Sequence, residues 1–547
     1  MIRINQLKLP VTHKKEDIPA KLAKTLKIPQ NRIRSWKVVK QSIDARKKDQ
    51  ILFIYTIDVE IENQQQLIKK LKNPQITLTK EDSYRFPSAG DIPLSTPPVI
   101  AGSGPAGLFC GLMLAEAGYC PIILERGEDV DSRQKKVTRF WLEGILDQHS
   151  NVQFGEGGAG TFSDGKLNTL VKDPLNRNKK VLEILVEHGA DPEILYINKP
   201  HIGTDVLSRI VKNIRKHITD LGGSVIFHAQ VTDLEIEAGR LRGVIINHKQ
   251  HIPAETFVLA VGHSARDTFS MLLGRGVPMK PKPFAVGLRI QHPQSMINEA
   301  QYGQNQSYQK NTLWQLLGPA SYKLTWQTSQ KRGIYSFCMC PGGYVVNASS
   351  EPGRLAVNGM SNHDRGGKNA NSALIVTITP EDFPGDSPLA GVEYQRNLEK
   401  TAYEYGHGNI PIQLYGDFKE GHESRGYGEV MPEFKGDVRF ANLKEMLPDY
   451  LSQSIIEGVE QFERIICGFS RYDAILAGIE SRTSSPVKIC RDDRFESEIK
   501  GLFPCGEGAG YAGGITSAAM DGIKIAEEIA RRYHLVTVHA QCHLGNT

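Results

Sequence analysis

The residues of this chain most suited to chemistry form a glycine-rich turn near residue 100. A short apolar run, Val99–Ala101, enters the turn, and a helical pattern leaves it. The turn comprises Gly102, Ser103, Gly104, Pro105, Ala106 and Gly107. Glu125 ends the next apolar run, 18 residues after Gly107. Glycines at this spacing bring backbone N–H groups to a pyrophosphate, and the acid accepts hydrogen bonds from ribose hydroxyls. The spacing therefore predicts a β-α-β unit that binds a dinucleotide.

The same G-x-G-x-x-G spacing recurs at Gly155 and Gly508, where the flanking sequence differs. Residues 161–166 follow the second copy and form no apolar helix, and the third copy lies too near the chain end for a ribose-binding strand. As independent dinucleotide sites, we interpret both as chance matches. The glycine-rich main chain at 155–160 would instead wrap a pyrophosphate or approach a ring without Cβ clashes. A purely structural loop is the alternative.

Two further segments complete the expected site. Residues 256–262 have the pattern of a buried strand that ends at a glycine, and residues 505–514 form a glycine loop before a helix at 515–531. This layout resembles the FAD domain of the glutathione-reductase-type flavoproteins, in which the C-terminal segment returns to close the FAD site. The resemblance implies FAD as the cofactor, with Glu507, where many relatives have Asp, facing the ribityl chain and pyrophosphate. The cofactor-binding candidates are Gly102, Ser103, Gly104, Pro105, Ala106, Gly107, Glu125, Arg126, Gly158, Gly160, Val231, Gly262, Gly506, Glu507, Gly514 and Ile515.

The helix that begins near Ile515 has a mechanistic role in this resemblance. Its N-terminal N–H groups point at the flavin N1–C2=O edge, where its dipole stabilises the negative charge of reduced flavin. Only one complete dinucleotide unit is present, so we expect no dedicated nicotinamide domain. NAD(P)H as reductant would therefore bind transiently in the substrate cleft. The C-x-x-x-x-C pair of disulfide reductases is absent beside the flavin motifs, which argues against disulfide reduction.

Four longer motifs resemble the signature of an uncharacterised family of bacterial FAD-dependent dehydrogenases. They lie at residues 42–47, 154–167, 337–343 and 481–486. Because they are spread along most of the chain, the resemblance covers nearly all of it. It implies FAD, a fused N-terminal ferredoxin-like module and an inserted middle domain.

The substrate and catalytic candidates come from these motifs and from a polar stretch at 358–371. The substrate candidates are Cys340, Arg365, Asn371, Arg482 and Ser484, and the catalytic candidates are Arg482 and Lys166. Arg365, with His363 and Asn369 nearby, suits an anionic or amide-bearing substrate, with a solvated loop as the equal alternative. His263 would approach the cofactor or be structural.

The spacing C-x-C at Cys338 and Cys340 would place both thiols on one face of a strand. A redox or metal role is one interpretation, but this spacing is awkward for a disulfide and no second ligand pair is evident. We favour structural or pocket-lining thiols, and we predict no metal site.

The fold class expected is α/β: a Rossmann-like FAD-binding domain with an inserted mixed α+β, β-rich substrate domain and an N-terminal ferredoxin-like α+β module. At 547 residues the chain is long enough for three or four domains. The predicted boundaries are 1–85 for the N-terminal module, 96–283 for the first part of the FAD domain, 284–484 for the inserted domain, 485–534 for the C-terminal return and 535–547 for a tail. Phe53 and Tyr55 share one face of a strand in the module, where burial is favoured over base stacking.

Charge is unevenly distributed. Residues 1–95 contain 19 Lys and Arg against 10 Asp and Glu, whereas the whole chain has a net charge of +5. A basic module suits nucleic acid or an acidic partner, although a solvated lysine-rich surface is the favoured interpretation. Eight scattered Cys, no apolar run long enough to span a bilayer and no signal-peptide pattern favour a cytoplasmic protein.

The favoured hypothesis is an FAD-dependent oxidoreductase that transfers hydride between flavin N5 and a small organic substrate. One alternative is a double-bond reductase similar to the geranylgeranyl reductases, which would need a long apolar groove. The other is an RNA-associated flavoprotein that uses the basic module. The sequence identifies neither the substrate, the electron donor nor the oligomeric state.

Overall fold

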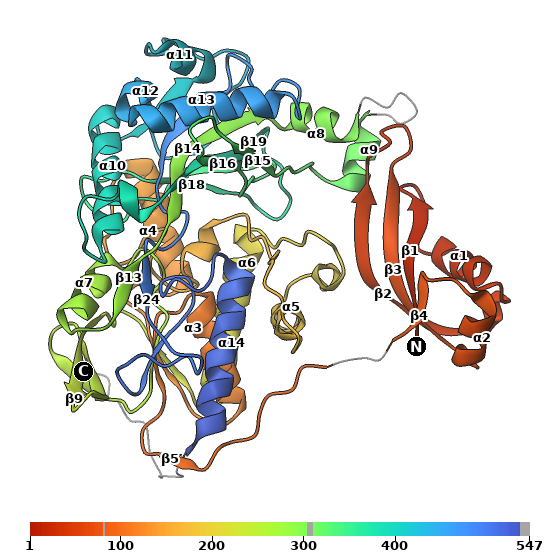
Figure 1. Ribbon diagram of the computed structural model, residues 1–547, viewed down its shortest axis with the longest axis horizontal. Helices are drawn as coiled ribbons and strands as arrows, with labels where there is room; N and C mark the ends of the chain where they lie inside the picture. The colour runs from red at the N-terminus through yellow and green to blue at the C-terminus, as the bar shows by residue number, and fades with distance from the viewer. Residues whose placement is uncertain (80–82, 304–309, 536–547) are drawn as a thin grey trace.

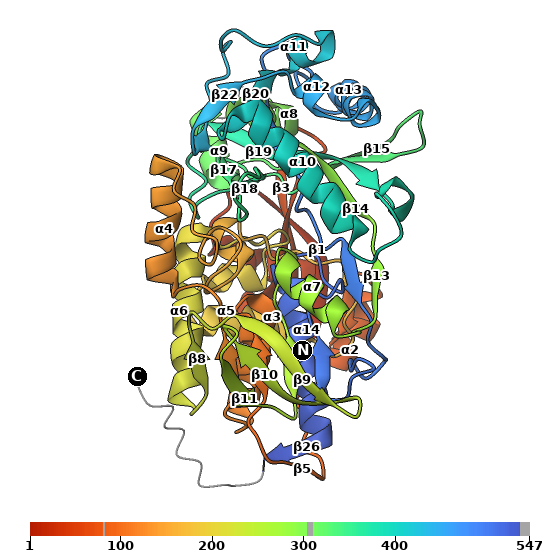
Figure 2. The ribbon, with the colours of Figure 1, turned by 90° about the vertical axis from the view of Figure 1, so that its left-hand side faces the viewer.

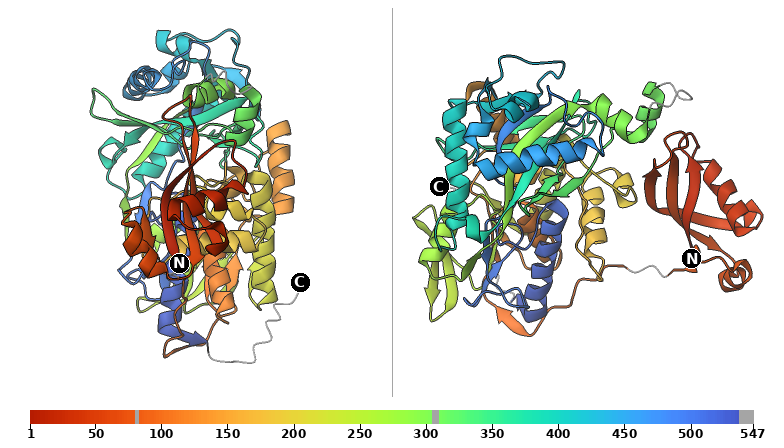
Figure 3. Two further views of the ribbon diagram at one scale, coloured as in Figure 1. Left: turned by 90° about the vertical axis from the view of Figure 1, so that its right-hand side faces the viewer. Right: turned by 45° about the horizontal axis from the view of Figure 1, so that its top comes forward.

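The computed structural model describes residues 1–79, 83–303 and 310–535. Three bodies are visible in Figure 1: an N-terminal module, a parallel sheet with its helices, and a mixed sheet above it. The module lies to one side of the other two bodies, as the right-hand view of Figure 3 shows. Backbone hydrogen bonds connect its Gln41 to Tyr196 and Asn198.

The N-terminal module has the connectivity β-α-β-β-α-β. Its elements are β1 (Ile2–Pro10), α1 (Asp17–Leu26), β2 (Ile33–Asp44), β3 (Leu52–Ile61), α2 (Gln64–Leu71) and β4 (Ile76–Leu78). The sheet order is β2-β3-β1-β4, and every pair is antiparallel. Apolar residues of α1 at helical spacing, Ile18, Leu22 and Leu26, are buried against the sheet. Phe53 and Tyr55 are also buried, so neither of these two rings is open for stacking bases.

The parallel sheet has the order β25-β12-β6-β7-β8. Its strands are β6 (Val99–Ala101), β7 (Ile122–Leu124), β8 (Ser224–Ile226), β12 (Phe257–Leu259) and β25 (Leu502–Pro504). Side chains alternate between its faces. Ile100 and Val258 pack on α3 (Pro105–Glu116), α5 (Arg177–Glu187), α6 (Thr204–Asp220) and α14 (Ile515–Arg532). Val99 and Leu259 pack on the opposite face.

That opposite face is covered by a meander and a helix. The elements are β9 (Val231–Glu237), β10 (Arg240–Ile246), β11 (Gln250–Pro253) and α7 (Arg266–Gly274). Helix α4 (Val130–Glu143) runs alongside α6, as Figure 2 shows. Helices α3 and α14 approach closely at Gly522, where a Cβ would lie 2.1 Å from the Ala106 carbonyl oxygen. Only glycine allows this crossing, which carries both helix N-termini to the same end of the sheet.

The mixed sheet has the order β15-β16-β19-β14-β23-β20-β22. Its strands are β14 (Phe284–Pro293), β15 (Leu324–Gln327), β16 (Gly333–Ser336), β19 (Asn369–Ile378), β20 (Ile410–Leu414), β22 (Val438–Phe440) and β23 (Ile475–Glu480). Leu374 and Val376 face the core that includes α13 (Asp449–Glu463) and α10 (Ala390–Gly406). The intervening Ala373 and Ile375 face the parallel-sheet body and line a cavity there.

The chain crosses between the two sheets through the antiparallel pair β13 (Met279–Pro281) and β24 (Val487–Ile489). The remaining strands are β5 (Ile92–Leu94), β17 (Tyr344–Asn347), β18 (Val357–Met360), β21 (Phe434–Lys435) and β26 (Tyr533–Leu535). The remaining α-helices are α8 (Gln294–Tyr302), α9 (Lys310–Leu317), α11 (Tyr415–Glu420) and α12 (Leu443–Met446). No helix in the described part of the chain is both long and apolar enough to cross a bilayer.

Two local expectations are corrected by the structure. The strand that begins at Gly333 ends at Ser336, and Cys338 has a φ of +51°, so Cys338 and Cys340 do not lie on one regular strand. Leu535, expected in a loose tail, belongs to β26, which pairs with β5. The rest of that expected tail lies outside the described residues, and the division of the chain into domains stays a prediction.

Candidate functional site

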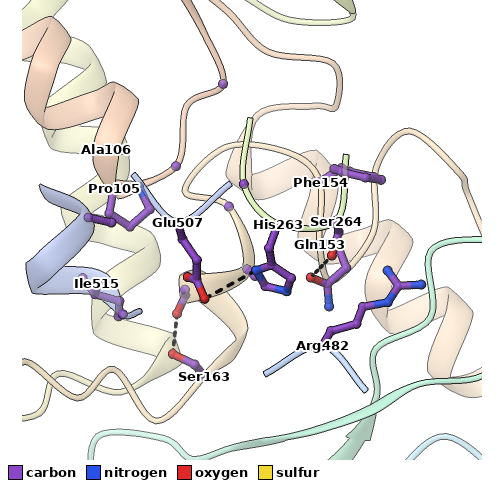
Figure 4. A pocket seen from close by; sticks show the side chains of 18 of the residues that line it. Pro105, Ala106, Gln153, Phe154, Ser163, His263, Ser264, Arg482, Glu507 and Ile515 are labelled. Atoms are coloured by element: carbon purple, nitrogen blue, oxygen red, sulfur yellow. Dashed lines mark hydrogen bonds and ion pairs between the residues drawn. The ribbon is translucent and has the colours of Figure 1, made fainter. Parts of the chain in front are cut away.

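One cavity of about 390 Å³ lies between the carboxyl ends of the parallel strands and the inner face of the mixed sheet. One part of its lining consists of glycine loops of the parallel-sheet body. The other part consists of residues in, or just after, the mixed-sheet strands β16, β19 and β23 and the nearby strand β18. Figure 4 shows one part of it, with Ile515 of α14 and Pro105 of α3 on one side and Arg482 on the other. The cavity therefore joins the predicted dinucleotide turn to the second sheet.

Close backbone packing explains the glycines of the first turn. Gly102 has a φ of +98°, and a Cβ there would lie 2.4 Å from the Ala260 carbonyl oxygen. A Cβ at Gly107 would lie 1.9 Å from the Gly102 carbonyl oxygen. Neither α3 nor α14 has a side-chain N-cap, so their first N–H groups stay open toward the cavity end. Two open helix N-termini beside one cavity favour an anionic group such as a pyrophosphate.

Glu125 has a different local role from the one the sequence predicts. Its Oε2 accepts hydrogen bonds from Ser103 N (2.9 Å) and Oγ (2.7 Å), and its Oε1 accepts from Gly127 N and Gly155 N (both 3.0 Å). These four bonds use the acceptor capacity of a carboxylate. The buried carboxylate thus ties the Gly102 turn, the end of β7 and the Gly155 loop together, while still lining the cavity. Ribose binding by Glu125 stays a prediction.

Arg133, which the sequence analysis missed, holds the Gly155 loop from behind. Its guanidinium donates to the carbonyl oxygens of Asn151 (2.9 Å), Val152 (3.0 Å), Glu156 (2.7 Å) and Gly158 (2.9 Å). Burial lowers the pKa of Arg133 to about 10, although Glu125 and Glu156 favour the charged form. The sequence contained a sign that Arg133 is buried, because it lies on the same face of α4 as the apolar Val137 and Phe140.

Glu507 and His263 form a contact on the cavity wall, drawn as a dashed line in Figure 4. His263 Nδ1 lies 3.7 Å from Glu507 Oε1, and His263 Nε2 is buried without a partner among the described residues. Burial raises the pKa of Glu507 to about 7, with Lys282 acting against the shift. Burial, reinforced by Arg482 and Arg266, lowers the pKa of His263 to about 3. The imidazole is therefore neutral beside a carboxyl group that titrates near neutrality.

The second sheet contributes a buried ion pair to the cavity. Arg289 Nη1 donates to both Glu480 oxygens (3.2 and 3.1 Å), and Arg289 Nη2 donates to Asn371 Oδ1 (2.5 Å) and the Cys338 carbonyl oxygen (3.1 Å). A Cβ at Gly359 would lie 2.0 Å from Arg289 Nη2, so glycine leaves room for the guanidinium. Burial raises the pKa of Glu480 despite Arg289.

A second ionic group lies beside this pair. Lys166 Nζ binds the Met339 carbonyl oxygen and lies 3.6 Å from Asp164 Oδ2. Arg365 donates to both Asp164 oxygens, and Ser361 also binds Asp164. Lys166 and Asp164 line the cavity, whereas Arg365 binds Asp164 without lining it.

Arg482 lines the cavity, but its guanidinium is occupied by other protein groups. It donates to both oxygens of Glu399 (3.0 and 2.9 Å) and to Ser350. Arg266 binds the same carboxylate, so Glu399 sits between two arginines with no exposed side-chain surface. This geometry gives Arg482 a positioning role at the edge of the cavity.

Most of the predicted cofactor residues meet in the cavity. Its lining includes Gly102, Gly104, Pro105, Ala106, Glu125, Arg126, Gly158, Gly160, Val231, Gly262, Glu507, Gly514 and Ile515. Ser103, Gly107 and Gly506 lie behind them and shape the turns.

The residues predicted to bind substrate, and the neighbouring Cys338, differ in whether they line the cavity. Cys338 and Cys340 line the cavity, Asn371 binds Arg289 behind it, and Ser484 lies outside the lining. The polar stretch does not form one cluster, because Asn369 binds Gln291 and Arg365 binds Asp164. Glu480, Gln153 and Phe154 also line the cavity and were not predicted from the sequence.

Two segments of the chain match models of known protein families. Residues 283–483 match the family model "FAD-dependent protein, C-terminal domain-like", and residues 1–60 match a domain of unknown function, DUF8436. The glycine cradle and the two open helix N-termini fit the pyrophosphate of FAD. The matched domain is one found in FAD-dependent proteins, and it supplies the second-sheet wall of the cavity.

A Clostridium beijerinckii protein described as an uncharacterized protein is 47% identical over 538 residues, covering 98% of this chain and 99% of that protein. The chain belongs to the same family as this protein.

Similar solved structures include a variant of E. coli quinol fumarate reductase, 14% identical with a TM-score of 0.35, covering 81% of this chain and 71% of that one. Another is L-proline dehydrogenase from P. horikoshii, 12% identical with a TM-score of 0.32, covering 80% and 94%. A third is glycine oxidase from Bacillus cereus, 12% identical with a TM-score of 0.31, covering 80% and 95%.

Proposed function

We propose that this protein is an FAD-dependent oxidoreductase acting on a small organic substrate. The observation that carries the proposal is the continuous cavity that begins at the glycine turn of a dinucleotide unit and ends at polar side chains of a second sheet. Bound FAD would supply hydride chemistry at flavin N5. NAD(P)H as the transient reductant stays part of the proposal and is tested with it.

Residues at the two ends of the cavity would have different roles, cofactor binding at one end and proton transfer at the other. The N-termini of α3 and α14 would hold the pyrophosphate, because no side chain caps either helix. Gly102, Gly104 and Gly158 line the cavity beside them and leave room for the group. Glu125 and Arg133 keep those loops in place. At the other end, Arg289 Nη1 is the one side-chain donor to Glu480 among the described residues, so Glu480 is positioned to hold or release a proton.

The alternatives receive less support. A double-bond reductase for isoprenoid chains would need a long apolar groove. In this cavity, the charged Lys166 and Glu480 lie beside the apolar Phe337, Ala373 and Ile375. The RNA-associated alternative loses its stacking face, because Phe53 and Tyr55 are buried in the module. A salt-dependent RNA-retention assay on the full chain tests it.

We expect the purified protein to show a flavin visible spectrum, or to acquire one after incubation with FAD and gel filtration. The anaerobic spectrum is then recorded before and after NADH or NADPH. Rapid bleaching by one nucleotide supports a nicotinamide-linked reductase, and a spectrum that stays oxidised points to another donor. If neither isolation nor incubation yields bound flavin, the proposed function is wrong.

We also expect FAD affinity to depend on pH through Glu507. Below its pKa of about 7 the carboxyl group is neutral, and above it the carboxylate repels the FAD pyrophosphate. The dissociation constant of FAD should therefore rise with pH, by at most about tenfold per unit above pH 7. Glu507→Gln should bind FAD with a flat profile, measured by calorimetry. The exposed Glu498→Gln is the matched control, and a slope that persists in Glu507→Gln contradicts the assignment.

A further inference from the structure

The carboxyl groups that line the cavity differ in how fully the protein occupies them. Glu125 accepts four hydrogen bonds, and Asp164 is bound by Arg365, Ser361 and Lys166. Glu507 has the long contact to His263, and Glu480 accepts from Arg289 Nη1 and from no other side chain in the described part of the protein. The negative charge of Asp164 is therefore already used by its own partners.

The charges at the mixed-sheet end of the cavity do not cancel. Three cations pair with two carboxyl groups here: Lys166 and Arg365 with Asp164, and Arg289 with Glu480. One positive charge is therefore in excess when both carboxyl groups are ionised. Protonation of Glu480, which burial favours, increases that excess. Burial also raises the pKa of the Cys338 and Cys340 thiols, which keeps them neutral at pH 7. This end of the cavity therefore attracts an anion.

Lys166 is the cation of this group that reaches the cavity. Arg289 is fully buried, and its guanidinium N–H groups donate to Glu480, Asn371 and the Cys338 carbonyl oxygen. Arg365 is turned to Asp164 and does not line the cavity. Lys166 has 35% of its side chain exposed, and its ammonium group carries three N–H donors for one carbonyl oxygen and one distant carboxylate. A donor remains for a ligand.

The space beside Lys166 suits a compact ligand. Gly359, Ala373 and Cys338 line the wall, and Phe337 and Ile375 add apolar surface. A small organic acid combines the two features this wall offers, a charged head for Lys166 and a short carbon skeleton for the apolar side. We propose that the substrate end of the cavity binds a small organic carboxylate through Lys166. This inference rests on the proposed function and names its substrate class.

The test measures binding of acetate, and of its neutral isostere acetamide, to the flavin-loaded protein at constant ionic strength. The readouts are calorimetry and the perturbation of the flavin visible band. Wild type should bind acetate at least tenfold more tightly than acetamide. Lys166→Met should weaken acetate by about tenfold or more while changing acetamide less than twofold, and Lys166→Arg should restore much of the loss. Lys216→Met, whose ammonium is exposed on α6, should match wild type.

Several outcomes would overturn the inference. One is equal affinity for acetate and acetamide in wild type. Another is a Lys166→Met variant whose flavin reduction potential shifts while its acetate affinity stays at the wild-type value. In that case Lys166 would interact with the cofactor and not with the substrate. Calorimetry does not need the flavin band, so a protein without flavin can still be tested with acetate. Absence of flavin therefore contradicts the proposed function, whereas flavin without acetate preference contradicts this inference alone.

Discussion

Glu125→Ala is expected to abolish FAD retention during purification and to raise the FAD dissociation constant about 100-fold or more. The substitution leaves three backbone N–H groups and the Ser103 hydroxyl without their acceptor. Each buried donor without a partner costs about 1–3 kcal/mol, and about 1.4 kcal/mol corresponds to a factor of ten in affinity. The Gly102 turn and the Gly155 loop should loosen, because the carboxylate bridges them and only the bond from Gly157 N to the Ser103 carbonyl oxygen is described beside it.

The measurements are the FAD dissociation constant by calorimetry and the midpoint of urea unfolding. Glu143→Ala is the control, since that carboxylate is half-exposed at the end of α4 and pairs only with Arg139. Glu125→Gln should give an intermediate result, because its amide keeps one acceptor oxygen and adds donors that face other donors. Wild-type affinity in Glu125→Ala would show that the loops are held without it.

Glu125 also illustrates what the sequence could predict. The acid at the end of the second strand was recognisable, and the β-α-β unit, the meander and the C-terminal helix have patterns visible in the chain. Two of the donors for Glu125 lie on Gly127 and Gly155, and the second belongs to a loop that was predicted to approach the cofactor but not to contact Glu125. Spacing along the chain carries no information on that contact, because it is made only when the strand and the loop are folded together.

The substrate end was less predictable for the same reason. Glu480 closes a run of buried residues in β23, where the pattern predicts a strand but gives no sign of a partner. Its partner Arg289 lies in the neighbouring strand β14, where Gly287 and Arg289 pair with Glu480 and Ala477. Arg482 was predicted as a substrate and catalytic candidate, yet its partner Glu399 comes from a helix more than 80 residues away. Charge pairs between distant elements require the tertiary fold.

Glu399→Gln is expected to lower the free energy of unfolding by about 3–5 kcal/mol at neutral pH. Glu399 is fully buried on α10 and binds both Arg266 and Arg482. Removing its charge leaves two buried guanidinium groups that share the remaining acceptors. Arg482 lines the cavity, so loss of its anchor should also weaken FAD or substrate binding. Glu404→Gln, on an exposed part of the same helix, should cost less than about 1 kcal/mol.

The acid dependence of stability gives an independent check on Glu399. Burial alone would raise its pKa, but the Arg266 and Arg482 guanidinium groups hold the pKa well below the ordinary value of 4.5. A depressed pKa contributes stability above the unfolded-state value and loses it as pH falls through the folded-state value. Wild type should therefore lose stability below about pH 4.5 more steeply than Glu399→Gln in urea titrations. Parallel acid profiles would mean that the two arginines do not depend on this carboxylate.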